Sequence, residues 1–243
     1  MTVTARRTVT VLDAADIVKV SEFYAALTGW EFADKDDDWI TLKTGDGQYV
    51  AFQLAPDHIP PQWPGQEHPQ QYHLDLYVAD PEAAAGKAVT LGATRLGAGA
   101  AWVTLADPAG HPFDLCRKDD AGDEISLFTA TIDAPDAAGL ARFYADLTGM
   151  EVTYEGPEGA LIAGDGRNLM FQQIADYTPP QWPDPAHPQQ GHTDVFIDDL
   201  DAGEARALEL GATRLPGQGR DFRVYADPAG HPFCLCIWPS SEN

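Results

Sequence analysis

The chain has 243 residues, of which 44% are hydrophobic and 22% charged, and its formal net charge is −23. This is an ordinary globular composition with enough apolar residues for a sizeable core. The acidity excludes nucleic acid and anionic membranes as expected partners, because both require clustered basic residues. No apolar run approaches about 18 residues and no signal-peptide pattern opens the chain, so we expect a cytoplasmic protein. The three cysteines, Cys116, Cys234 and Cys236, do not form a disulfide framework.

The first half of the chain predicts an ordered series of strands and helices. Two helices are expected, between Asp16 and Gly29 and between Asp80 and Leu91, because each begins at a capping aspartate. The expected strands are Thr8–Ala14, Trp39–Lys43, Tyr49–Leu54, the segment around His73, Trp102–Ala106 and Pro112–Arg117. The residues between Arg95 and Ala101 leave room for one more short strand. The resulting order is βαβββ followed by βαβ(β)β.

The same series then repeats after a polar linker. Pro60–Asp80 (PPQWPGQEHPQQYHLDLYVAD) matches Pro179–Asp199 at an offset of 119, and Asp107–Phe113 (DPAGHPF) matches Asp227–Phe233 at an offset of 120. A period of this length is too long for a solenoid and indicates two homologous domains. We predict a first domain at residues 1–118, a linker at 119–125 and a second domain at 126–243.

Three motifs give the chain a resemblance to a known family. They are FY…LTG in the first helix, a histidine followed seven residues later by aspartate at His73 and Asp80, and the DPAGHPF turn. Together they resemble the vicinal oxygen chelate superfamily, which includes glyoxalase I, extradiol dioxygenases, and fosfomycin- and bleomycin-resistance proteins. The resemblance implies an α+β fold of two tandem domains, each a pair of βαβββ modules with curved mixed sheets enclosing a cleft. The chain would then be a monomer that forms an internal pseudo-dimer, or a homodimer. Whether the modules pair within each domain or across the two stays open.

The resemblance also implies four metal-ligand positions in each domain. In chain order of the motif they hold Val9 and Thr129, then Gln53 and Gln172, then His73 and His192, and finally Asp114 and Cys234. Only the third position keeps the family's histidine, and a catalytic divalent ion usually needs three good protein ligands. We therefore predict no bound metal and no cofactor. The alternative is a weakly bound divalent metal held by His73, Gln53 and Asp114.

Two His-x-Asp pairs are the candidate catalytic residues. His73 with Asp75, and His192 with Asp194, place an imidazole and a carboxylate on one face of a strand, which suits acid–base chemistry. Alternatively, each aspartate pairs with Arg95 or Arg214, and each histidine is a hydrogen-bonded cavity residue. Cys234 is likewise open to two interpretations, as a nucleophile near His192 or as a small buried apolar residue.

The expected aromatic clefts without metal ligands suggest a binding protein. Our hypothesis is a cytoplasmic protein that binds a small molecule and sequesters an aromatic natural product or antibiotic. The alternative is an enzyme of the same fold, a lyase, isomerase or dioxygenase acting on a small oxygenated metabolite. Trp63 and Trp182 either close over the clefts or fix their loops to the surface. The residues expected to contact the ligand are Gln53, Trp63, His73, Asp75, Tyr77 and Asp114 in one domain, and Gln172, Trp182, His192, Asp194, Phe196, Cys234 and Trp238 in the other.

Overall fold

The computed structural model describes residues 5–122, 124–184 and 186–238. They form two eight-stranded mixed sheets and four helices. Residue 123 of the expected linker lies outside the described residues, as do the outer ends of the two expected domains, 1–4 and 239–243. Among the described helices, none has the length and apolar character needed to cross a membrane.

Each repeat supplies two modules, and each module is one strand, one helix and three further strands. The first repeat contains β1 (Arg7–Ala14), α1 (Ile17–Thr28), β2 (Glu31–Lys35), β3 (Trp39–Lys43), β4 (Tyr49–Leu54), β5 (Tyr72–Val78), α2 (Pro81–Thr90), β6 (Thr94–Ala98), β7 (Trp102–Ala106) and β8 (Pro112–Arg117). The second contains β9 (Ser126–Ala134), α3 (Ala137–Thr148), β10 (Glu151–Gly156), β11 (Gly159–Gly164), β12 (Arg167–Gln173), β13 (Gly191–Ile197), α4 (Leu200–Glu209), β14 (Thr213–Gln218), β15 (Phe222–Ala226) and β16 (Pro232–Ile237). The predicted α+β fold of four βαβββ modules is confirmed.

The helix ends follow the expected capping chemistry. The Asp16 side chain accepts a hydrogen bond from the backbone N–H of Lys19, and Gly29 ends α1 in the left-handed region with φ 81°. Asp80 caps α2 in the same way, with Pro81 in its first turn. By contrast, β2 was not located from the sequence, because all five of its residues are exposed and carry no alternating apolar pattern.

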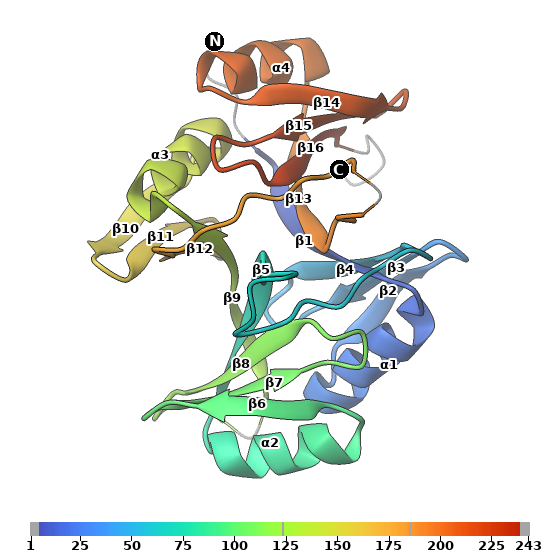
Figure 1. Ribbon diagram of the computed structural model, residues 1–243, viewed down its shortest axis with the longest axis vertical. Coiled ribbons are helices and arrows are strands. Elements are labelled where there is room, and N and C mark those ends of the chain that lie inside the picture. The colour runs from blue at the N-terminus through green and yellow to red at the C-terminus, as the bar shows by residue number, and fades with distance from the viewer. Residues whose placement is uncertain (1–4, 123, 185, 239–243) are drawn as a thin grey trace.

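Each repeat packs its own aromatic core between helices and strands. In the first, Tyr24 of α1 packs against Phe52 of β4 and Phe113 of β8, with ring centroids 5.7 and 5.9 Å away. Tyr144 packs in the same way against Phe171 and Phe233 in the second. Figure 1 accordingly shows two lobes, the first repeat with α1 and α2 below and the second with α3 and α4 above.

The two sheets, however, each run through both repeats. β1 pairs antiparallel with β13, and β5 pairs antiparallel with β9. The strand orders are β14-β15-β16-β13-β1-β4-β3-β2 and β10-β11-β12-β9-β5-β8-β7-β6. The question that the sequence left open is therefore answered: the first module pairs with the fourth and the second with the third, across the repeats. We call the resulting concave faces cleft A, on the sheet of β1 and β13, and cleft B, on the sheet of β5 and β9.

The DPAGHPF turns hold buried hydrogen-bond networks behind the clefts. Asp107 accepts hydrogen bonds from the backbone N–H groups of Ala109 and His111 and from the Tyr24 hydroxyl. Asp227 does the same for Ala229, His231 and Tyr144. These contacts satisfy groups that would otherwise be buried without partners, so the turns stabilise the fold.

Candidate functional site

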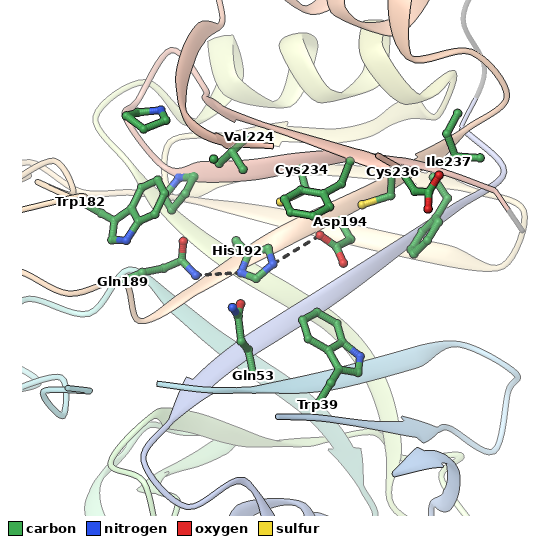
Figure 2. Close-up of a pocket in the computed structure, with 16 residues that line it drawn as sticks. Trp39, Gln53, Trp182, Gln189, His192, Asp194, Val224, Cys234, Cys236 and Ile237 are labelled. Carbon is green, nitrogen blue, oxygen red and sulfur yellow. Dashed lines mark hydrogen bonds and ion pairs between the residues drawn. The ribbon is translucent and has the colours of Figure 1, made fainter. Parts of the chain in front are cut away.

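Cleft A contains a cavity of about 550 Å³. Strands β13, β15 and β16 of the fourth module line one side of it, and β3 and β4 of the first module line the other. Figure 2 shows Trp39 and Gln53 on one side of His192, with Val224 and Cys234 on the other. The lining residues are Trp39, Gln53, Trp182, Gln189, His192, Asp194, Phe196, Pro216, Gly217, Asp221, Phe222, Val224, Pro232, Cys234, Cys236 and Ile237.

A hydrogen-bonded histidine forms the polar floor of cleft A. His192 is buried, and its Nε2 lies 3.4 Å from a carboxylate oxygen of Asp194. Its Nδ1 lies 2.9 Å from Gln189 Nε2, which also donates to Asp13 at 2.8 Å. Burial is the largest single influence on the pKa of His192 and lowers it. The contacts with Asp13, Asp194 and Cys234 together raise the pKa by more, so it lies well above its ordinary value.

Two cysteines stand beside this histidine on β16. Cys234 and Cys236 both line the cavity and are both free thiols. The hydrogen bond from Cys236 is the main influence on the pKa of Cys234; together with His192 it outweighs burial and lowers that pKa to about 7. The pKa of the Cys236 thiol is raised, chiefly because it donates this hydrogen bond and is buried. The arrangement therefore favours the thiolate at Cys234.

Cleft B is smaller and more polar. Its cavity of about 160 Å³ is lined by Trp63, Gln70, His73, Trp102, Thr104, Pro112, Asp114 and Gln172. His73 Nε2 lies 3.8 Å from Asp75, whose carboxylate also accepts hydrogen bonds from the Thr131 hydroxyl and, at 3.6 Å, from the Cys116 thiol. Burial raises the pKa of Asp114, although His73 and Thr104 partly oppose this.

The exchange of modules changes which predicted residues meet. Gln53 faces His192 and Cys234 in cleft A, and Gln172 faces His73 and Asp114 in cleft B. The expected set of His73, Gln53 and Asp114 is therefore wrong, since Gln53 lies in the other cleft. The reason is physical: the fourth strand of each module lies beside its first strand, and that first strand pairs with the other repeat.

The family comparison bears on this tandem arrangement. A family model described as a glyoxalase-like domain matches residues 9–116 and again residues 129–236. The chain belongs to this glyoxalase-like family. The resemblance to the vicinal oxygen chelate superfamily is thereby confirmed, as is the tandem organisation.

Solved structures with the same fold extend over nearly the whole glyoxalase-like chain. Glyoxalase I from Zea mays superposes with a TM-score of 0.65 at 16% identity, covering 97% of this chain and 93% of that one. A candidate dioxygenase from Bacillus subtilis gives 0.63 at 13% identity, covering 97% and 86%. The cppA protein from Streptococcus pneumoniae gives 0.55 at 13% identity, covering 97% and 100%. At these identities the likeness shows the fold alone. No curated protein matches the chain by sequence.

The metal arrangement of the superfamily does not fit the residues of this glyoxalase-like protein. At the first ligand position, Val9 packs with Val11 and Ala51 in an apolar cluster, and the Thr129 hydroxyl donates to the Ala130 carbonyl oxygen at 2.8 Å. At the second position, a glutamine amide is a weak neutral ligand. We therefore derive no chemical step through a metal.

Each cleft nevertheless gathers three donor side chains, and in each set the donor atoms lie within 4.8 Å of one another. The sets are His192, Asp194 and Cys234 in cleft A, and His73, Asp75 and Asp114 in cleft B. Within each set the side chains contact one another or their neighbours, as described above for His192 and Asp75. The expected absence of metal remains a prediction.

Other sequence expectations have mixed outcomes. The proposed pairing of Asp75 and Asp194 with arginines is wrong, because Arg95 binds Glu82 at 2.7 Å and Arg214 binds Glu204. Three predicted ligand contacts are absent from the described cavity linings: Asp75, Tyr77 and Trp238. Tyr77 instead stacks on Phe128, with ring centroids 4.4 Å apart, and Trp238 packs against Phe196. Trp63 and Trp182 line clefts B and A respectively.

The sequence interpretation missed the side chains that hold the two histidines. Gln189 binds Asp13 beside His192, and Gln70 binds Asp133 at 3.2 Å in cleft B. The signal was present, since both glutamines belong to the repeated HPQQ segment and both aspartates recur at an offset of 120. Identity between the two repeats could have selected them. Trp39 and Phe222 carry no such signal, because their counterparts are Gly159 and Trp102.

Proposed function

We propose that this protein binds a small, planar aromatic molecule in cleft A and sequesters it. The observation that carries the proposal is a cavity of about 550 Å³ with aromatic walls and a polar floor. Pockets for drug-sized ligands usually enclose roughly 300–1,000 Å³ and combine apolar walls with a few oriented polar groups. Cleft B, at about 160 Å³, falls below this range.

The side chains of cleft A suit a flat ligand. Trp39 is half-buried, with its ring centroid 6.3 Å from that of His192, and its indole N–H already donates to Thr41. Its ring face is thus available to a ligand, while Phe222 on the far side of the cavity is 41% exposed. Aromatic rings give large apolar contact at little entropic cost. The Gln53 amide and the His192–Asp194 pair would orient polar substituents.

Ligand binding is tested with a set of planar aromatic metabolites and antibiotics. Quenching of tryptophan fluorescence gives the affinity, and a ligand at about 100 times its Kd stabilises the protein by roughly 2.7 kcal/mol. Trp39→Leu is expected to weaken binding about tenfold, as loss of one aromatic contact predicts. Trp102→Leu, in cleft B, is the matched control and leaves affinity unchanged. No binding across the whole set, or equal losses in both variants, would overturn the proposal.

A second candidate is an enzyme of the same fold, acting as a lyase, isomerase or dioxygenase on a small oxygenated metabolite. The His192–Asp194 pair at the cavity floor supports it, because an imidazole beside a carboxylate suits proton transfer. A His192→Gln variant that keeps ligand affinity but loses product formation would favour this candidate. Binding without turnover in the wild type would favour sequestration.

The setting we propose is a cytoplasmic monomer whose two repeats form an internal pseudo-dimer. Three free cysteines agree with a reducing compartment. The net charge of −23 argues against nucleic acid or anionic membrane as a partner. Light scattering after size exclusion tests the monomer, which has a mass of 26.3 kDa; twice that mass would indicate a homodimer.

A further inference from the structure

Cys234 faces the cavity and not the hydrophobic core. Its neighbours on β16, Phe233 and Leu235, are fully buried in the core, and strand alternation turns Cys234 to the opposite side. There it is half-buried and lines cleft A. The interpretation of Cys234 as a small apolar core residue is therefore wrong for its position. An accessible thiol in a ligand-sized cavity is a candidate reactive group.

The surroundings of Cys234 favour its ionised form. The His192 nitrogen, an Asp194 oxygen and Cys234 Sγ lie within 4.8 Å of one another. Cys236 donates a hydrogen bond to the Cys234 sulphur, and the raised pKa of His192 places an imidazolium beside it. The other titratable groups that face this cluster are Asp13, which lies 3.8 Å from His192, and Asp221 from the far wall of the cavity.

The two other thiols provide an internal contrast. Cys116 occupies in cleft B the place that Cys236 occupies in cleft A, and it donates to the Asp75 carboxylate at 3.6 Å. Burial and the neighbouring carboxylates raise the pKa of Cys116. Cys236 is the donor to Cys234 and its pKa is raised too. Of the three cysteines, Cys234 alone combines access to the larger cavity with a neighbouring cation and a hydrogen-bond donor.

We propose that Cys234 is a nucleophile that forms a thioether with an electrophilic aromatic ligand, an enone or quinone, held in cleft A. This inference rests on the proposed function of the cleft. The thiolate gives an electron pair to the β-carbon, a carbon–sulphur bond forms, and the π electrons of the C=C bond move toward the carbonyl. The proton lost by the thiol returns to the resulting enolate, and His192 in the same cluster can carry it. The adduct is the sum of protein and ligand, so no oxidant or leaving group is involved.

Three single variants and two classes of probe test the inference on the full chain. N-ethylmaleimide at one equivalent, with intact mass and peptide mapping, locates the reactive thiol. Naphthoquinone is the aromatic electrophile, and naphthol is its non-electrophilic counterpart for reversible binding. Cys234→Ser tests the nucleophile, and Cys116→Ser and Cys236→Ser are the matched controls. Serine is close in size to cysteine, and circular dichroism verifies that each variant folds.

We expect one adduct per chain, on Cys234, formed at least about tenfold faster than at either other thiol. Its rate should rise with pH through a midpoint near 7, and Cys234→Ser should lose it while Cys116→Ser keeps it. Naphthoquinone should react with saturation kinetics, and naphthol should compete. Labelling spread over the thiols, or a Cys234 rate equal to that of glutathione, would overturn the inference; if naphthol still quenches tryptophan fluorescence, the proposed function survives. Labelling of Cys234 without saturation by either aromatic probe would overturn both.

Discussion

Gly191 allows a direct test of the seam between the two repeats. It pairs with Leu12 across β1 and β13, and a Cβ atom at this position would lie 2.6 Å from the carbonyl oxygen of Val11. Real Cβ atoms essentially never approach so closely, and a backbone oxygen inside a sheet cannot move without shifting its strand. Gly191→Ala is therefore expected to lower the free energy of unfolding by about 1–3 kcal/mol, the usual cost of overpacking.

Gly86→Ala is the matched control for the same chemical change. Gly86 is exposed in α2 and a Cβ atom there would meet nothing within 4 Å. Alanine in a helix interior should raise the free energy of unfolding by about 0.5–1 kcal/mol. Urea denaturation measures both variants, and each kcal/mol corresponds to a melting shift of about 2–4 °C in a chain of this size. A Gly191→Ala protein as stable as wild type would refute the β1–β13 seam.

Three further outcomes are expected. Cleavage at a protease site placed in the exposed linker near Asp119 should leave the halves together in size exclusion, because both sheets cross the repeats; separate halves in native buffer would contradict this. Asp114→Asn should stabilise the protein at neutral pH by about 1 kcal/mol, since Asp114 Oδ1 is buried without a partner. Because the folded pKa is raised, this gain should be absent below about pH 4 and grow as pH rises, and a pH-independent gain would contradict it. Elemental analysis after purification without added metal should find no stoichiometric divalent ion, and near-equimolar zinc, nickel, iron or manganese would contradict that.

Much of the fold was readable because its signals are local. Capping at Asp16 and Asp80 depends on side chains within a few residues of the helix start, and these helices begin where expected. The strands with alternating apolar residues, such as β5, were placed for the same reason. Strands at the sheet edges are different, because β2 buries nothing and its sequence EFADK carries no pattern. Its pairing with β3 is dictated by chain connection and not by composition.

The partner of each first strand could not be read from local signals. β1 and β9 are both apolar, β-branched strands of similar sequence, and either could satisfy its backbone hydrogen bonds on β5 or β13. The choice is decided by which lobes pack together, a property of the whole chain. This is why the chemistry of each strand face was predicted correctly at His73 and His192, while the companion glutamine of each was assigned to the wrong cleft.

The difference between the two clefts comes from a few positions on one duplicated scaffold. At equivalent places cleft A has Val224 and Cys234 where cleft B has Thr104 and Asp114. Both keep the glutamine, histidine and aspartate that form the floor, because those groups hydrogen bond to one another across the seam. The apolar and thiol substitutions are therefore confined to the walls of one cleft. A scaffold that needed both clefts only for folding would have no reason to remove a carboxylate and leave a larger apolar cavity on one side alone, and this asymmetry is what directs the ligand hypothesis to cleft A.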